Sequence, residues 1–377
     1  MMNAQSSTPH PGHDSVDTLV PLSPGSEAHA WRHERAKVVA ATQGSEEALF
    51  DPSLNGLSLD ERLQVAAYLC ELSGMTTMAQ HYRARSPATS HETESPRERV
   101  LREFTRKLAL RPVEGDRAAL EALKQAGLDA ADVVALAQLI GFVTYQIRLV
   151  AGLKALASAD FQTPAVAASD TSEPFVHPAN LPAPGQPVQV GGFTSATLDW
   201  KAWLPTLDPA HATPDQLRVL AASHPKASSS DYYLTLAQQP RILEERSEVF
   251  NAIMYAPGGL SRSERELASA VVSRINGCVY CAAVHAQRFE QLTKRNDVIV
   301  QVFSDPDYAG TNARERAIVQ VSADLTRQPA AFSAASLQAV LAAGLGPIEV
   351  LDLIHAIAIF AWANRLMLNL GEPVWPQ

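Results

Sequence analysis

The chain has 377 residues, of which 46% are hydrophobic and 19% are charged, and its formal net charge is −9. This length allows about two or three domains with sizeable cores, and the composition excludes a disordered chain. The mild acidic excess argues against nucleic-acid and anionic-membrane partners. Only three cysteines occur, Cys70, Cys278 and Cys281, which excludes the disulfide framework of a small secreted protein.

Residues 1–26 are rich in Ser, Pro, His and Gly and show no basic segment followed by an apolar run. They do not resemble a signal peptide, and we expect a disordered tail. The most apolar stretch, residues 350–363, is interrupted by Asp352 and His355 and is shorter than the roughly 20 apolar residues of a membrane span. We therefore expect a cytoplasmic protein without a membrane partner.

The rest of the chain predicts an all-α fold. Apolar residues recur at helical spacing over residues 27–158 and again over residues 196–377, which predicts two helical domains. Between them, residues 159–195 are heavy in Pro and small polar residues and predict an extended linker. Alternating runs of β-branched residues are scarce, so that strands are not expected.

The two helical regions resemble each other in sequence. Two blocks align at a constant offset within each block, and the offset changes at an insertion within residues 293–310. We interpret this pattern as an internal duplication. The residues shared by both copies include Ser58/Ser261, Glu61/Glu264, Arg62/Arg265, Gly74/Gly277, Pro112/Pro329 and Arg148/Arg365.

The duplication separates shared residues from residues that occur in one copy. We expect the shared residues to be structural, with Arg148 and Arg365 forming salt bridges to Glu61 and Glu264. Polar or reactive residues of the second copy replace apolar or aromatic residues of the first: Glu266 for Leu63, Cys278 for Met75, Cys281 for Met78, His285 for Tyr82 and Asn364 for Ile147. The second copy is therefore expected to carry the activity, and the first to serve packing.

The reactive residues surround a predicted helix–turn–helix. Residues 263–274 predict a helix, Asn276-Gly277 predicts a turn, and a new helix begins near Cys278. Both Cys278 and Cys281 then lie at the first turn, where unpaired N–H groups and the helix dipole favour a thiolate and lower a cysteine pKa.

Two further residues complete this constellation. His285 shares the helix face of Cys278 and Cys281 and can accept a proton from Cys281. Glu266 lies on the preceding predicted helix, and it reaches the same pocket if the two helices fold back on each other. Its carboxylate could then orient His285 or a water molecule.

A C-x-x-C pair also occurs in zinc sites, at haem attachment sites and in thioredoxin-like proteins. A zinc site would have an unusual ligand set here and lacks a second C-x-x-C motif. Haem attachment requires a histidine where Ala282 stands, and a thioredoxin-like site expects a βαβ setting. A purely structural pair is possible, although the first copy packs methionines there. We favour redox chemistry, with no metal and no cofactor beyond the Cys278–Cys281 dithiol, and we interpret Cys70 and His355 as core residues.

The string ERELASAVVSRINGCVYCAAVHAQRF, which starts at Glu264, resembles the alkylhydroperoxidase D and carboxymuconolactone decarboxylase-like superfamily, in particular its peroxidase-related branch. Its signature is matched by Glu266, Cys278, Cys281 and His285. The resemblance implies two tandem AhpD-like helical domains, the first degenerate, and an enzyme that reduces organic hydroperoxides. It also implies a homotrimer, because members assemble as trimers or as hexamers built from dimers, and a fused pair resembles one such dimer.

In the implied mechanism, Cys281 attacks the peroxide as a thiolate and becomes a sulfenic acid. Cys278 then forms a disulfide with it, and an external dithiol reductant restores the pair. His285 relays protons with Glu266. Tyr280 departs from the best-studied members, which carry histidine there, and a phenol with a pKa of about 10 cannot relay protons in the same way at neutral pH.

Two alternatives remain open. A cofactor-free lyase of the carboxymuconolactone decarboxylase type would use Glu266 and His285 for proton transfer, but it leaves the cysteines unexplained. A non-enzymatic redox-sensing assembly protein would use disulfide formation to change its packing against a partner. A thiol-dependent hydroperoxide reductase is the leading hypothesis.

Overall fold

The computed structural model describes residues 14–86, 94–161, 176 and 180–376. The helices of the first half are α1 (Ser15–Leu19), α2 (Glu27–Glu34), α3 (Ala36–Leu49), α4 (Leu59–Leu72), α5 (Thr76–Arg85), α6 (Pro96–Leu110), α7 (Arg117–Gln125) and α8 (Ala130–Ala157). Those of the second half are α9 (Pro214–Ser223), α10 (Asp231–Leu236), α11 (Pro240–Met254), α12 (Arg262–Ile275), α13 (Val279–Thr293), α14 (Asp297–Ser304), α15 (Ala313–Arg327), α16 (Gln338–Ala342) and α17 (Pro347–Asn369). The all-α prediction is confirmed.

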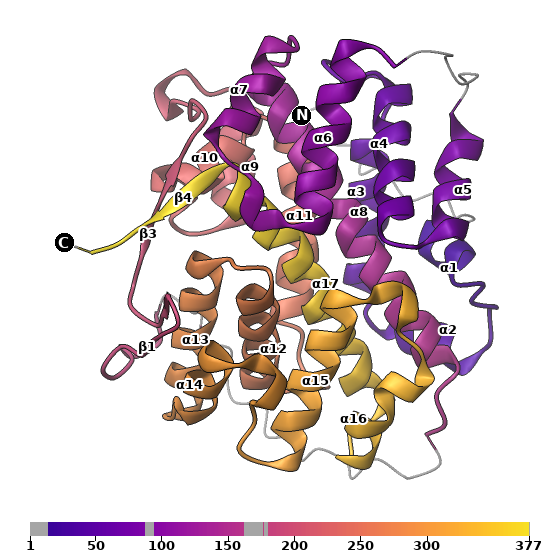
Figure 1. Ribbon diagram of the computed structural model, residues 1–377, viewed down its shortest axis with the longest axis vertical. Coiled ribbons are helices and arrows are strands. Elements are labelled where there is room, and N and C mark those ends of the chain that lie inside the picture. The colour runs from indigo at the N-terminus through magenta and orange to yellow at the C-terminus, as the bar shows by residue number, and fades with distance from the viewer. Residues whose placement is uncertain (1–13, 87–93, 162–175, 177–179, 377) are drawn as a thin grey trace, which may run out of the picture.

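Small β-ribbons accompany the helices in the described residues. The strands are β1 (Gln189–Val190), β2 (Phe193–Thr194), β3 (Asp199–Ala202) and β4 (Gly371–Val374). β1 pairs antiparallel with β2, and β3 pairs antiparallel with β4. The second ribbon joins the segment before α9 to the end of α17 (Figure 1).

The same local signal starts α4 and α12. At α4 the hydroxyl of Ser58 accepts from the backbone N–H of Glu61, whose carboxylate accepts in return from the backbone N–H of Ser58. Ser261 and Glu264 make the same reciprocal pair at α12. This capping box satisfies backbone donors that a helix start leaves unpaired. The residues shared by the two copies therefore perform the same local task.

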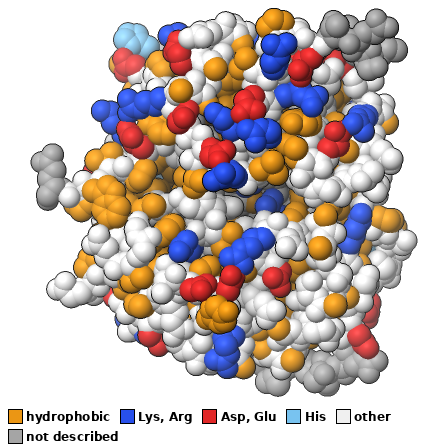
Figure 2. All heavy atoms as spheres, in the orientation of Figure 1, with side chains coloured by type: hydrophobic (Ala, Val, Ile, Leu, Met, Phe, Trp, Pro, Cys, Tyr) orange, Lys and Arg blue, Asp and Glu red, His pale blue; other side chains and the backbone are white. Residues whose placement is uncertain are grey.

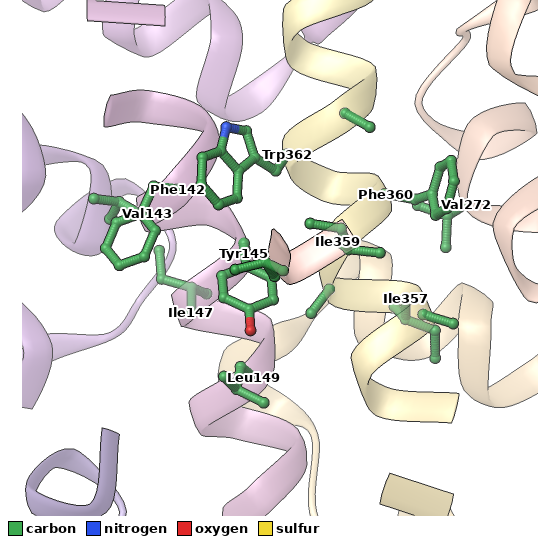
Figure 3. Packing of buried hydrophobic residues seen from close by; sticks show 14 of the residues in the cluster. Phe142, Val143, Tyr145, Ile147, Leu149, Val272, Ile357, Ile359, Phe360 and Trp362 are labelled. Atoms are coloured by element: carbon green, nitrogen blue, oxygen red, sulfur yellow. The ribbon is translucent and has the colours of Figure 1, made fainter. Parts of the chain in front are cut away.

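Helices α8 and α17 run side by side through the middle of the molecule (Figure 1). Trp362 of α17 lies against Phe142 and Tyr145 of α8, as Figure 3 shows. A Cβ atom at Gly141 would lie 2.1 Å from the indole Cδ1 of Trp362, so that only glycine allows this approach. Both helices have the length and hydropathy of a membrane span, but their apolar windows are 100% and 94% buried inside the protein.

Two buried arginines, one from each half, each donate a hydrogen bond to a helix of the other half. Arg148 of α8 donates to the carbonyl oxygen of Thr326 in α15, at 2.6 Å. Arg365 of α17 donates to the carbonyl oxygen of Ala109 in α6, at 3.1 Å. Each arginine also donates to the carbonyl four residues earlier in its own helix. These contacts are equivalent under the proposed repeat, although the duplication itself stays a prediction.

The salt bridges expected for these arginines are wrong. Glu61 pairs with Arg97, and Glu264 pairs with Arg314. The physical reason is position, because both glutamates cap the first turn of their helices and lie near the surface. Arg148 and Arg365 instead lie deep in the core among helix carbonyls. Burial lowers the pKa of Arg148 to about 10.

The predicted disordered tail, residues 1–26, is corrected from residue 14 onward. The side chain of Asp14 caps α1, and Val16 and Leu19 of this helix are buried. Residues 1–13 lie outside the described part. Because α1 has only five residues, its apolar residues show no clear helical period in the sequence. The burial of its side chains stabilises a helix that is too short to be stable on its own.

The predicted linker, residues 159–195, is likewise ordered in its last part. Phe193 of β2 is buried, and its ring centre lies 5.7 Å from that of Phe303 in α14. Residues 162–175 and 177–179 lie outside the described part. The domain boundaries at 158 and 196 stay a prediction, since one cluster of buried side chains extends through both halves.

Charges of both signs alternate on the face drawn in Figure 2. Lys and Arg side chains lie close to Asp and Glu side chains over the upper and lower parts of this face, with hydrophobic side chains scattered between them. This face therefore shows no extended surface of a single charge.

Candidate active site at the Cys278–Cys281 dithiol

The predicted helix–turn–helix is present in the second half. α12 ends at Ile275, Gly277 has a φ of 75°, and Cys278 is the N-cap of α13. Positive φ values are readily adopted by glycine, which explains this residue at the sharp turn. Cys281 and His285 follow at helical spacing on α13.

A residue of α17 fastens this turn. The side-chain amide of Asn276 donates to Oδ1 of Asn364 at 3.0 Å, and Nδ2 of Asn364 donates to the hydroxyl of Ser273 at 3.0 Å. Asn364 is fully buried. The sequence pointed to a role for Asn364 because its proposed counterpart in the first half is Ile147. Its two partners, in α12 and at its C-cap, were missed by sequence reasoning.

Glu266 and His285 meet as predicted. Nδ1 of His285 lies 2.5 Å from Oε2 of Glu266, and both side chains are buried. An ionised carboxylate only accepts hydrogen bonds, so that Nδ1 carries the hydrogen and Nε2 is the nitrogen left for proton exchange. The ring of Phe360 from α17 meets the imidazole edge-on at 4.3 Å and fixes its plane. Arg262 lies 3.9 Å from the other carboxylate oxygen.

The two thiols are more enclosed than the sequence indicated. Cys278 and Cys281 are buried free cysteines. Burial raises the pKa of Cys278 well above its ordinary value, and the neighbouring Cys281 raises it further. The expected lowering of the pKa is therefore wrong for Cys278, because loss of solvation outweighs the helix terminus. Burial also raises the pKa of Tyr280, to about 12, so that this phenol stays protonated at neutral pH.

An aromatic group with one arginine lies within electrostatic reach of the dithiol and was missed by sequence reasoning. Tyr232 of α10 is buried, and its pKa is raised by burial and further by several neighbours that include both cysteines. The guanidinium carbon of Arg246 in α11 lies 5.6 Å from the ring centre of Tyr232 and 5.2 Å from that of Phe250. α10 lies outside the repeated blocks, so the comparison of the two copies gave no signal for Tyr232.

A cavity of about 790 Å³ opens next to this group. The first half lines it with the junction of α2 and α3, including Arg35 and Lys37, and the second half with the ends of α9 and α11. Tyr233, Phe250 and Tyr255 form part of its wall. Glu266 contributes to the raised pKa of Tyr255, after burial, which places this wall close to the Glu266–His285 pair.

The equivalent place in the first half is closed. Tyr82, the counterpart of His285, is fully buried, and its hydroxyl donates to Oε1 of Gln146 at 2.5 Å. The amide of Gln146 donates in turn to Glu46 at 3.1 Å. Cys70 is also fully buried, and burial raises the pKa of its thiol. This network therefore uses its polar groups internally.

One group among the described residues has the geometry of a metal site. Ligand atoms of Asp17, His29 and His33 lie within 4.8 Å of one another. Arg32, however, donates to the carboxylate of Asp17 at 2.7 Å and already neutralises its charge. The four predicted dithiol-site residues do not form such a group in the described chain.

Part of the chain matches a known protein family. Residues 240–324, which contain Glu266, Cys278, Cys281 and His285, match the carboxymuconolactone decarboxylase family. The second half therefore contains a carboxymuconolactone decarboxylase-like helical segment, as the sequence motif indicated. No curated protein matches the chain at a significant level.

Two solved structures are similar to part of the chain. The alkylhydroperoxidase AhpD core of an uncharacterized peroxidase-related protein from Ralstonia eutropha JMP134 has 23% sequence identity, with 44% of this chain and 87% of that chain covered and a TM-score of 0.39. An uncharacterized peroxidase-related protein from Silicibacter sp. TM1040 has 24% identity, with 44% and 89% covered and a TM-score of 0.36.

Proposed function

We propose that this protein is a thiol-dependent hydroperoxide reductase whose Cys278–Cys281 pair alternates between dithiol and disulfide. The observation that carries the proposal is the hydrogen bond between Glu266 and His285, made beside a C-x-x-C pair at the start of the same helix. A histidine held by a carboxylate is a general base in reach of a nucleophile one helical turn away.

The proposed reaction begins with transfer of the Cys281 proton to Nε2 of His285. The thiolate attacks the terminal peroxide oxygen, the O–O bond breaks, and the leaving alkoxide takes the proton from His285 to become an alcohol. Cys281 is now a sulfenic acid. The Cys278 thiol attacks its sulfur, water leaves, and a disulfide forms. An external dithiol supplies two electrons and two protons to restore the pair.

The burial of Cys278 fits the resolving role. Its raised pKa keeps it a thiol until the sulfenic acid has formed next to it. The other cysteine is therefore assigned the first attack, as the resemblance implied. The glutamate has a positioning role, because it contacts the histidine rather than the sulfur.

The proposal is tested by single cysteine substitutions. Cys281→Ser should abolish dithiol-dependent consumption of cumene hydroperoxide, because the attacking sulfur is lost. Cys278→Ser should still consume one equivalent and accumulate a sulfenic acid that dimedone traps. Cys70→Ser is the matched control and should keep wild-type turnover. Unchanged turnover in Cys281→Ser would end this proposal.

The family match also favours a second candidate, a cofactor-free lyase that uses Glu266 and His285 for proton transfer. A variant with both Cys278 and Cys281 replaced by serine separates the two, since a lyase would keep its activity and a dithiol peroxidase would lose it. Redox-dependent binding of a partner without peroxide turnover would instead favour the redox-sensing alternative.

We also propose a cytoplasmic homotrimer, in which three two-copy chains take the place of the six subunits in a hexamer built from three dimers. Light scattering tests the assembly, and a mass near 40.6 kDa, that of one chain, would contradict it.

A further inference from the structure

The buried carboxylate of Glu266 is held between two basic side chains. Its Oε2 lies 2.5 Å from Nδ1 of His285, and its Oε1 lies 3.9 Å from Nε of Arg262, which stands one helical turn earlier on α12. The glutamate side chain is only 3% exposed. An ionised carboxylate is costly to bury unless a cation balances it. While the imidazole is neutral, Arg262 supplies that positive charge.

Two further contacts hold Arg262 in place. Its Nη1 donates to the carbonyl oxygen of Val176 at 2.8 Å. Its guanidinium carbon lies 5.1 Å from the ring centre of Tyr255, the residue that follows α11. A guanidinium over an aromatic face gains cation–π attraction. These contacts come from outside α12, and they keep the guanidinium beside the carboxylate.

Other titratable groups near this pair come from α13 and from the end of α11. Burial lowers the pKa of Arg288 on α13, and the charge of Glu266 opposes this effect. Burial raises the pKa of Tyr255 and that of Tyr280, so that both phenols are neutral at pH 7. α17 presents the uncharged ring of Phe360 to the imidazole. Ion pairs on α14, α15 and α17 engage the following residues with other partners: Asp297, Arg314, Glu315, Glu349 and Asp352.

Resting on the proposed peroxidase function, we propose that Arg262 is a positioning residue that sets the pH range in which His285 accepts the Cys281 proton. The arginine takes up part of the negative charge of Glu266, so that the carboxylate orients the imidazole without keeping it protonated. In the first step the proton moves from Sγ of Cys281 to Nε2 of His285, and later it moves from Nε2 to the leaving alkoxide. Both transfers require an imidazole that starts neutral and can give the proton up again.

Loss of the arginine charge should make proton uptake by the Glu266–His285 pair easier. The added proton then resides on the imidazole or on the carboxylate, and both arrangements hold the same number of protons, so that the pair titrates as one unit. A charge in direct contact moves such a titration by about 1 to 3 pH units. Arg262 contacts the carboxylate rather than the imidazole, so that we expect a shift of about one unit toward higher pH.

Nuclear magnetic resonance of the reduced protein tests this shift without turnover. In Arg262→Gln the imidazole resonances of His285, assigned by their loss in His285→Gln, should titrate about one pH unit higher than in the wild type. Arg274→Gln is the matched control on α12. Arg274 also donates to a carbonyl oxygen, that of Phe303, and lies over an aromatic ring, that of Phe193, but no ion pair in the described residues includes it. This control should titrate as the wild type does.

Kinetics provide the second readout. The acid limb of kcat/KM for cumene hydroperoxide should move to higher pH in Arg262→Gln, so that the rate falls by about tenfold on the acid side and approaches the wild-type rate at high pH. Arg262→Lys keeps the positive charge and should reverse most of the shift. A loss of the same size at every pH would overturn the proposal, because the arginine would then serve only the fold.

The two proposals can fail separately. If the wild type consumes no hydroperoxide but the imidazole titrates higher in Arg262→Gln, the peroxidase is wrong and the control of the pair by Arg262 stands. If the wild type is active and His285 titrates at the same pH in both proteins, the role of Arg262 is wrong. Should Arg262→Gln fail to fold, Arg262→Met decides, because it keeps apolar packing on Tyr255 without the charge. An unchanged titration in that variant overturns the proposal.

Discussion

Cys278 lies at a helix start, where the backbone favours a thiolate, yet its pKa is raised because the side chain is buried. The position of His355 on an apolar helix face predicted a core histidine with its hydrogen bonds satisfied. The structure confirms the burial, but Nδ1 of His355 has no hydrogen-bond partner among the described residues. Sequence spacing thus identified which residues are chemically capable, but solvation decides their protonation, and solvation depends on the packing of distant helices.

Glu266→Gln is predicted to lower kcat for peroxide reduction by about 100-fold, within the range for general acid–base catalysis. The amide cannot stabilise a protonated His285 as the carboxylate does. A reduced steady-state turnover in Glu266→Gln, together with a near-normal unfolding temperature, would establish the positioning role of Glu266. Glu264→Gln, on the same helix, keeps the capping box but loses the ion pair with Arg314, so it should cost at most about 1 kcal/mol of stability and leave turnover unchanged. Equal activity loss in both variants would contradict this assignment.

His355 predicts how stability depends on pH. The pKa of His355 is lowered to about 3, chiefly by burial and also by Arg32, Arg35 and Arg265, against the effect of Asp352. The unfolded chain binds this proton near pH 6.5 and the folded chain only near pH 3, so that stability falls as pH falls through this window.

The contribution amounts to at most about 1.4 kcal/mol per pH unit. Urea unfolding between pH 7 and pH 4 should therefore show a smaller loss of stability in His355→Leu than in the wild type. His211→Leu is the control, because His211 is a surface residue paired with Asp208. Parallel slopes for the wild type and His355→Leu would contradict the prediction.

At the scale of elements, the α12–turn–α13 unit was predictable because its signals are local. Ser261 and Glu264 mark the helix start, and Asn276-Gly277 mark the turn, without reference to the rest of the chain. Tyr232 could not be found in this way. Its place is set by the packing of α10 against β3 and of Tyr232 against Arg246 of α11, and such packing has no signature in a short sequence window. The same limit hid the partners of Asn364.

Asn364→Ala is predicted to lower both stability and turnover. Its loss leaves Asn276 and Ser273 with unsatisfied polar groups, at a cost of about 1–3 kcal/mol, and loosens the turn before Cys278. The matched control is Asn369→Ala on the same helix, since the amide of Asn369 donates only to the carbonyl of Arg365. Thermal unfolding and turnover measured together test this. Asn369→Ala should lose stability but keep its turnover. Intact turnover in Asn364→Ala would refute the role of Asn364 in holding the turn before Cys278.

At the scale of the whole molecule, the proposed repeat indicates which residues correspond but not how the two halves fit together. The sequence predicted two helical domains joined by a linker. In the structure α8 and α17 pack against each other, α3 packs against α11, and buried side chains form one cluster through both halves. In the described residues, each half has apolar helix faces that helices of the other half cover. Periodicity reports that a face is apolar and cannot report which partner covers it.

Because the two halves share one core, a substitution that destabilises one half should also destabilise the other half. Arg365→Met removes the contact from α17 to the carbonyl of Ala109, at a cost of about 1–3 kcal/mol for unsatisfied buried carbonyls. In a Cys278→Ser/Cys281→Ser background, Cys70 is the remaining thiol and reports on the first half. The urea midpoint for labelling Cys70 should fall together with the midpoint for loss of helical circular dichroism. Arg106→Gln, which removes a surface guanidinium paired with Glu103, should shift neither. If Cys70 stayed protected while part of the helical signal was lost, the halves would unfold as independent domains, since a common core requires a single transition.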